Sequence, residues 1–124
     1  MKYECKVDYQ YCLNLVKKNP YTLQYIKNPT EELCLAAVKQ NGWTIEYIEN
    51  PTEEMYLAAV KQDGLVIECI ANPTEKVCLE AVKTCGGAIK YIENPTKEMC
   101  SIAVEQNKDN IEYINNPLLA VLFK

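Results

Sequence analysis

The sequence predicts an all-α fold, a right-handed α-solenoid of about five repeats of 22 residues. An Asn-Pro pair returns at a fixed spacing of 22, and the residues between successive pairs line up without a gap. Each copy holds a long apolar stretch, a turn and a shorter apolar stretch. Such regularity is typical of a stacked helical array. The pairs begin at Asn28, Asn50, Asn72, Asn94 and Asn116.

We expect a single domain over residues 1–124, because a chain of this length can bury roughly two thirds of its unfolded surface. Residues 6–27 form a degenerate first repeat, and residues 116–124 form a partial last one. The regular repeats between them are 28–49, 50–71, 72–93 and 94–115.

The longer helix of each repeat is exemplified by "NPTEELCLAAVKQNG", residues 28–42. Either Asn28 caps it with Pro29 in the first turn, or Thr30 caps it with Pro29 just outside. We expect about eleven helical residues, ended by Asn41-Gly42 in the left-handed conformation that closes many helices.

The shorter helix follows in "WTIEYIE", where Ile45 and Ile48 lie three residues apart on one face. The next Asn-Pro leaves room for only one or two turns of α or 3-10 helix. Neither helix is stable alone, so stacking has to cover both.

Positions that vary least among the repeats predict how they stack. Small residues allow neighbouring long helices to approach to about 8–10 Å, which gives a stack roughly 45–50 Å long. The long-helix positions are Ala37, Ala59, Ala81, Ala103 and Val16, Val38, Val60, Val82, Val104. The matching ridge on the short helices is Ile26, Ile48, Ile70, Ile92 and Ile114.

The phrases "LAAVKQNG" and "EYIENPTEE" resemble an uncharacterised family of short helical repeats. That family is a domain of unknown function with an "AVxQNG" signature, found in bacteria, phages and giant viruses. The resemblance covers residues 28–117 and implies an α-helical repeat fold. It implies no catalytic residues. Cys85 stands in place of the turn Asn, and Lys108 in place of the turn Gly.

Composition excludes several function classes. The net charge is −4, so we expect no nucleic-acid partner. The 13 basic residues are all Lys, and there is no His or Arg, so catalytic triads and His-containing metal sites cannot form. We expect no enzyme activity, no cofactor and no metal.

The seven cysteines follow no CxxC pattern, and we expect free thiols in a protein that stays in the cytoplasm of the producing cell or an infected host. No apolar run approaches the ~18 residues of a membrane span, so we expect no membrane partner. Cys85, in the turn "TCGG", is expected to be the most exposed thiol. Equivalent positions in the long helix, interpreted as core, hold Cys12, Cys34, Cys78 and Cys100.

Tyrosines recur on the short helices beside the Ile ridge; we call Tyr3, Tyr25, Tyr47, Tyr91 and Tyr113 the tyrosine row. Cys69 interrupts it. These rings either stack between repeats or form a contact strip flanked by acidic residues, since Tyr offers large area at low entropy cost. The flanking residues are Glu46, Glu68 and Glu112.

Positions where the copies differ are candidates for specificity. One lies just after the turn, at Trp43, Leu65, Gly87 and Asp109. Trp43 is the only Trp, and it is either a local plug or a binding hot spot. The last segment, "NPLLAVLFK", either tucks across the open end of the stack or pairs with another copy.

We therefore expect a non-enzymatic protein-protein interaction scaffold, in its sharper form a phage- or virus-type inhibitor or adaptor aimed at a host defence protein. One alternative is a small-ligand binder or thiol-dependent enzyme using Cys85. Another is a structural protein that self-assembles, as a homodimer through residues 117–124, rather than a monomer. The protein-binding residues predicted are Tyr25, Trp43, Glu46, Tyr47, Leu65, Glu68, Tyr91 and Tyr113.

Overall fold

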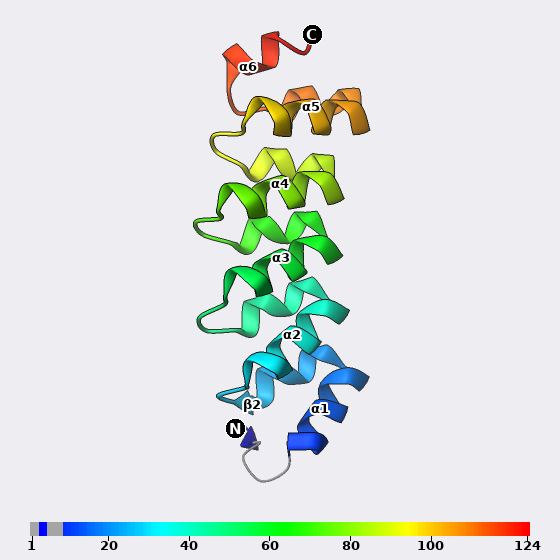
Figure 1. Ribbon diagram of the computed structural model, residues 1–124. Helices are drawn as coiled ribbons and strands as arrows, with labels where there is room; N and C mark the ends of the chain where they lie inside the picture. Colours follow the sequence, from blue (N-terminus) through cyan, green and yellow to red (C-terminus); the bar gives the residue numbers. More distant parts are fainter. Residues whose placement is uncertain (1–2, 5–8) are drawn as a thin grey trace. The chain divides into compact units, whose positions relative to one another are not determined.

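The computed structural model describes residues 3–4 and 9–124, and over these residues α-helices alternate with six-residue 3-10 helices, labelled η (Figure 1). The predicted all-α fold of repeated elements is confirmed. The helices are α1 (Tyr9–Lys18), η1 (Pro20–Tyr25), α2 (Glu31–Gln40), η2 (Gly42–Tyr47), α3 (Glu53–Gln62), η3 (Gly64–Cys69), α4 (Glu75–Thr84), η4 (Gly86–Tyr91), α5 (Lys97–Gln106), η5 (Lys108–Tyr113) and α6 (Pro117–Val121).

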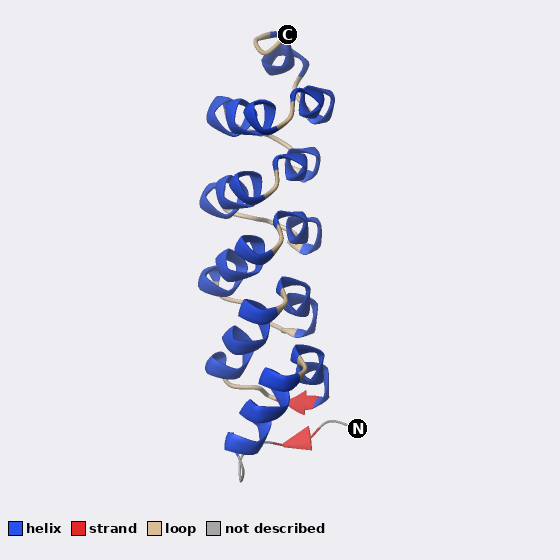
Figure 2. Ribbon diagram, turned by 90° about the vertical axis from the view of Figure 1, so that its right-hand side faces the viewer, coloured by secondary structure: helices blue, strands red, loops and turns tan. Residues whose placement is uncertain are grey.

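The chain divides into two compact units, an N-terminal unit (Met1–Gln62) and a C-terminal unit (Asp63–Lys124). In the N-terminal unit, α2 packs between α1 and α3, and η1 contacts η2. Two short parallel strands, β1 (Tyr3–Glu4) and β2 (Ile26–Lys27), lie side by side in Figure 2. They were not predicted, because two residues are too few to show a strand pattern. The division of the whole chain into one domain and the handedness of the stack stay predictions.

The C-terminal unit is built in the same way, from one row of long helices and one row of 3-10 helices. Its 3-10 helices η3, η4 and η5 contact one another in order, and α4 packs against η3, η4 and α5. The short helix α6 lies against α5.

Threonine decides where the long helices begin. The Thr30 hydroxyl accepts a hydrogen bond from Leu33 N at 3.2 Å, and α2 starts at Glu31. Thr74 caps α4 in the same way. The second of the two capping alternatives is therefore correct. Asn28, in contrast, has a φ of 50°, a left-handed backbone that Asn tolerates better than most residues.

The predicted left-handed helix end is wrong. Asn41 has a φ of −149°, which is extended backbone, and no glycine among the described residues has a positive φ. Asn41 instead joins the two helices: its N–H closes α2, and its Oδ1 accepts a hydrogen bond from Trp43 N at 3.0 Å to cap η2. Cys85 keeps the same backbone, with φ −147°, although its thiol makes no capping hydrogen bond.

Glycine follows this turn for a steric reason. A Cβ at Gly42 would overlap the carbonyl oxygen of Ala59 in the next long helix. The same overlap would occur between Gly64 and Ala81. Glycine is therefore needed so that the start of a 3-10 helix can touch the backbone of the following repeat.

The predicted core is largely confirmed. All four alanines of the long-helix row are fully buried, as are Val16, Val38, Val60 and Val82. Val104 and Ile48 are only half-buried, which differs from the expectation for their rows. The other four members of the Ile ridge are at most 8 % exposed.

Glutamine side chains connect successive long helices within each unit. Gln40 Nε2 donates to Val16 O at 3.1 Å in the N-terminal unit. Gln106 Nε2 donates to Val82 O at 2.9 Å, and its Oε1 accepts from Gly86 N at 2.7 Å. The two bonds from Nε2 satisfy carbonyl groups that the last turn of a helix leaves unpaired, and the bond to Oε1 satisfies the Gly86 N–H at the start of η4.

The longest helices in the described part of the chain have ten residues, and none is long and apolar enough to cross a membrane.

Candidate functional site

The N-terminal unit presents part of the tyrosine row to solvent. Tyr25, at the end of η1, is 58 % exposed, and Tyr47, at the end of η2, is 36 % exposed. Glu46 beside Tyr47 is exposed, and Trp43 at the start of η2 is half-buried. These four predicted residues therefore all lie on the 3-10 helices of one unit.

Tyr21 is a member of this surface that the sequence analysis missed. Its ring meets the edge of Tyr47 with centroids 6.1 Å apart and planes at 76°, the favourable edge-to-face geometry. Its hydroxyl accepts a hydrogen bond from Asn41 Nδ2 at 2.9 Å. Counting back 22 residues from Trp43 gives Tyr21, so the repeat itself held the signal. We call Tyr21, Tyr25, Trp43 and Tyr47 the aromatic surface.

The C-terminal unit holds Tyr91 and Tyr113, which are 38 % and 42 % exposed. The Lys90 Nζ atom lies 5.0 Å from the Tyr91 ring centroid and 5.6 Å from that of Tyr113. Lys90 was not predicted, although it occupies the position of Glu46 and Glu68. One ammonium group is thus held against two neighbouring rings of the row by cation–π attraction.

The remaining predicted residues of this unit lie on η3, where Glu68 is exposed and Leu65 half-buried. Cys69, which replaces tyrosine in the row, is exposed as well. Tyr3 of the row lies in β1, and its side chain lies outside the described part of the structure.

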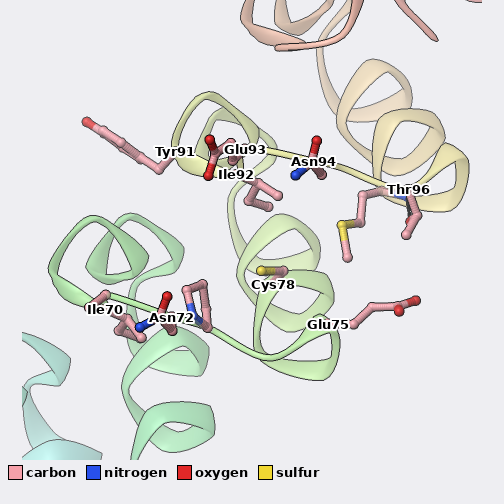
Figure 3. Close-up of a pocket in the computed structure, with 12 residues that line it drawn as sticks. Ile70, Asn72, Glu75, Cys78, Tyr91, Ile92, Glu93, Asn94 and Thr96 are labelled. Atoms are coloured by element: carbon pink, nitrogen blue, oxygen red, sulfur yellow. Dashed lines mark hydrogen bonds between the residues drawn. The ribbon is translucent and has the colours of Figure 1, made fainter.

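A groove of about 360 Å³ lies in the C-terminal unit between two successive Asn-Pro loops (Figure 3). Asn72 borders it on one side and Asn94 on the other, with Cys78 of α4 between the loops. Tyr91 also lines this groove, so the tyrosine row and the groove are continuous here.

The N-terminal unit has the same groove, again of about 360 Å³, between the loops that carry Asn28 and Asn50. Each of its nine lining residues has a counterpart 44 positions later, two repeats on, among those of the C-terminal groove. The groove is therefore a product of the repeat and not of one local irregularity.

Both grooves have an apolar floor and a polar rim. Ile48 and Met55 lie in the first, Ile92 and Met99 in the second. The rims carry two glutamates and two asparagines each. Among the residues that the structure describes, none of these eight side chains makes a hydrogen bond or ion pair; they are Asn28, Asn50, Glu31, Glu49 and Asn72, Asn94, Glu75, Glu93.

The cysteines correct two expectations. Cys12 is disulfide-bonded, so the thiols are not all free, whereas Cys34, Cys78, Cys85 and Cys100 are. The bond does not join members of the core row, because the other three, Cys34, Cys78 and Cys100, are free. Cys69 is exposed and Cys85 only half-buried, so Cys85 is not the most exposed thiol. Cys5 lies outside the described residues.

Burial controls the chemistry of the core thiols. Desolvation raises the pKa of Cys34, and the nearby Glu31 carboxylate raises it further. Cys78 has a raised pKa for the same two reasons, with Glu75 as the neighbour. A thiol with a raised pKa stays protonated at neutral pH, so the groove floors are uncharged.

The C-terminal helix α6 leaves much of its apolar surface exposed to solvent. Leu118 is 82 % exposed, Val121 63 % and Leu122 61 %, while Leu119 and Ala120 are half-buried. The helix contacts α5, yet it leaves an apolar face in solvent.

Over residues 3–4 and 9–124, no three His, Cys, Asp or Glu side chains lie together in a way that could hold a metal ion.

A family model described as a domain of unknown function (DUF4116) matches residues 8–51. That stretch holds most of the degenerate first repeat and all of the repeat 28–49. No curated protein and no solved structure matches the chain. Over residues 8–51 the chain is thus similar to an uncharacterised family of proteins.

Proposed function

We propose that this chain is a non-enzymatic binding protein whose 3-10 helices and Asn-Pro loops contact another protein. The observation that carries the proposal is the aromatic surface: Tyr21, Tyr25 and Tyr47 are each more than a third exposed on two adjacent short helices. Tyrosine and tryptophan dominate the energetics of protein interfaces, because their rings bury large areas with few rotatable bonds.

The test compares capture of partner proteins from cell lysate by the wild type and by a Trp43→Ala/Tyr47→Ala variant. The variant is expected to lose the partner. Tyr11→Ala is the matched control, because Tyr11 is 50 % exposed but lies on α1, outside the 3-10 helices. Circular dichroism has to show that all three proteins are folded. Equal recovery by the wild type and the double variant would refute the proposed surface.

A narrower form of the proposal is that the chain is an inhibitor or adaptor of phage or viral type, acting on a host defence protein in the cytoplasm. Its support is the acidic charge and the likeness of residues 8–51 to an uncharacterised family. Co-purification with a defined host protein, lost in the Trp43→Ala/Tyr47→Ala variant, would support this form. Partners with no common role would speak against it.

Self-association is a second candidate function, and the apolar face of α6 favours it. A homodimer through residues 117–124 would cover Leu118, Val121 and Leu122. Sedimentation at increasing protein concentration is expected to show growing mass, which a Leu118→Asp/Leu122→Asp variant would abolish. A wild type that stays monomeric at high concentration would exclude this candidate.

A further inference from the structure

We propose that each of the two grooves binds a lysine side chain of an extended segment of the partner protein. This inference rests on the proposed function and adds the chemistry of what is bound.

The shape and polarity of the groove favour a lysine side chain. A volume of about 360 Å³ lies at the small end of ligand pockets, so it suits one or two side chains and not a large cofactor. The floor is apolar and uncharged, and matches the methylene stem of lysine. The rim matches its ammonium group, because Glu31 and Glu49 border one groove and Glu75 and Glu93 the other.

Within the described part of the chain, the only charged side chains that line the two grooves are glutamates, which suits a positively charged ligand. No lysine lines either groove, and none of the four rim glutamates is in an ion pair with another residue of the described ranges. At Tyr91 and Tyr113, next to the C-terminal groove, the chain itself shows an ammonium group, that of Lys90, held against the aromatic row. The surroundings of the groove therefore already accommodate a lysine head group.

The asparagines favour an extended backbone. In each groove two side-chain amides from successive repeats have both donor and acceptor groups unused, as a peptide backbone requires. The distance between the two asparagines of a groove is set by the packing of successive helices, roughly 8–10 Å. A polyproline II segment repeats every three residues, about 9.3 Å, so its backbone groups recur at a similar distance.

The experiment titrates the full chain with the blocked peptide Ac-KAAKAAK-NH2 and with the same peptide acetylated at each lysine Nε. Seven residues are too few for a stable helix, so neither peptide has to unfold a helix to bind in an extended form. The lysine peptide is expected to bind and to shift the side-chain amide NMR signals of Asn28, Asn50, Asn72 and Asn94. The acetylated peptide is expected to bind at least tenfold more weakly.

Two variants with the same net charge separate the groove from general attraction to an acidic protein. Glu49→Gln/Glu93→Gln removes one carboxylate from each groove and is expected to weaken peptide binding roughly three- to tenfold. Glu54→Gln/Glu105→Gln removes two exposed carboxylates that line neither groove and is expected to bind as the wild type does. Equal weakening in both variants, or equal affinity for both peptides, would overturn the groove proposal.

The two proposals fail in different ways. Loss of the partner in the Trp43→Ala/Tyr47→Ala variant without any selective peptide binding would overturn the groove and leave the aromatic surface standing. Selective peptide binding in a chain whose aromatic variant keeps its partner would support the groove and refute the aromatic surface.

Discussion

Replacing Gly64 with alanine tests the steric reason for glycine after the turn. The new Cβ would overlap the carbonyl oxygen of Ala81, and it would lie 3.0 Å from Cys85 Cβ and 3.1 Å from Cys85 N. These atoms belong to the backbone or are fixed to it, so they can move only if η3 and α4 separate.

The expected cost follows from two opposing effects. Overpacking a well-packed site costs about 1–3 kcal/mol, and more where backbone has to move. Alanine regains about 0.4–1 kcal/mol by restricting the unfolded chain. Because the atoms met are backbone or fixed to it, the cost lies at the upper end, about 3 kcal/mol, and we expect Gly64→Ala to lower the free energy of unfolding by about 2 kcal/mol, measured by urea denaturation followed by far-UV circular dichroism.

Gly87→Ala is the matched control in the same unit. Its Cβ would meet Cys85 Sγ at 3.8 Å and Asn110 Oδ1 at 4.0 Å, which are ordinary contacts, and its backbone suits alanine. The control is expected to be neutral or to stabilise by up to about 1 kcal/mol. If the two variants unfolded within about 0.5 kcal/mol of each other, the reasoning about close approach would be wrong.

Three further predictions concern stability. Cys85→Asn supplies the missing acceptor for the Gly87 N–H and should raise the free energy of unfolding by about 0.5–1 kcal/mol in the same urea assay. A decrease would contradict the capping role of this position. Gln106→Ala leaves the Gly86 N–H without its acceptor and the Val82 carbonyl without its donor, and should cost about 1–3 kcal/mol in that assay. An unchanged free energy of unfolding would contradict the role of these two hydrogen bonds. Alkaline pH should destabilise the fold, because a thiol whose pKa is raised in the folded state contributes stability that is complete below its ordinary pKa of about 9 and is lost as the pH rises above it. The measurement is the urea midpoint of unfolding as a function of pH. A midpoint that stays constant at alkaline pH would refute the assignment of raised thiol pKa values. The thiols concerned are Cys34, Cys78 and Cys100.

Repetition made most of the fold readable from the sequence. Asn-Pro at a spacing of 22 predicted the repeats, and the apolar stretches predicted a long and a short helix in each. The alanine and valine rows predicted the core, because a position kept small or apolar in every copy has to face the neighbouring copies. The repeat also predicted that Tyr25, Tyr47, Tyr91 and Tyr113 occupy one position of the short helix, but it left open whether their rings are covered or exposed; the structure exposes each of them by more than a third.

The sequence by itself therefore determined the elements, their order and the residues they bury. Only the tertiary structure decided what depends on neighbouring repeats: that Gly42 and Gly64 allow backbone contact and do not form left-handed turns, that Lys90 lies against two tyrosines, and that two Asn-Pro loops enclose a groove. The physical reason is that helix periodicity and capping are local and recur in every copy. The close approach of Gly42 to Ala59, the contact of Lys90 with Tyr113 and the shape of each groove all depend on residues of successive repeats, and no pattern within one repeat contains them.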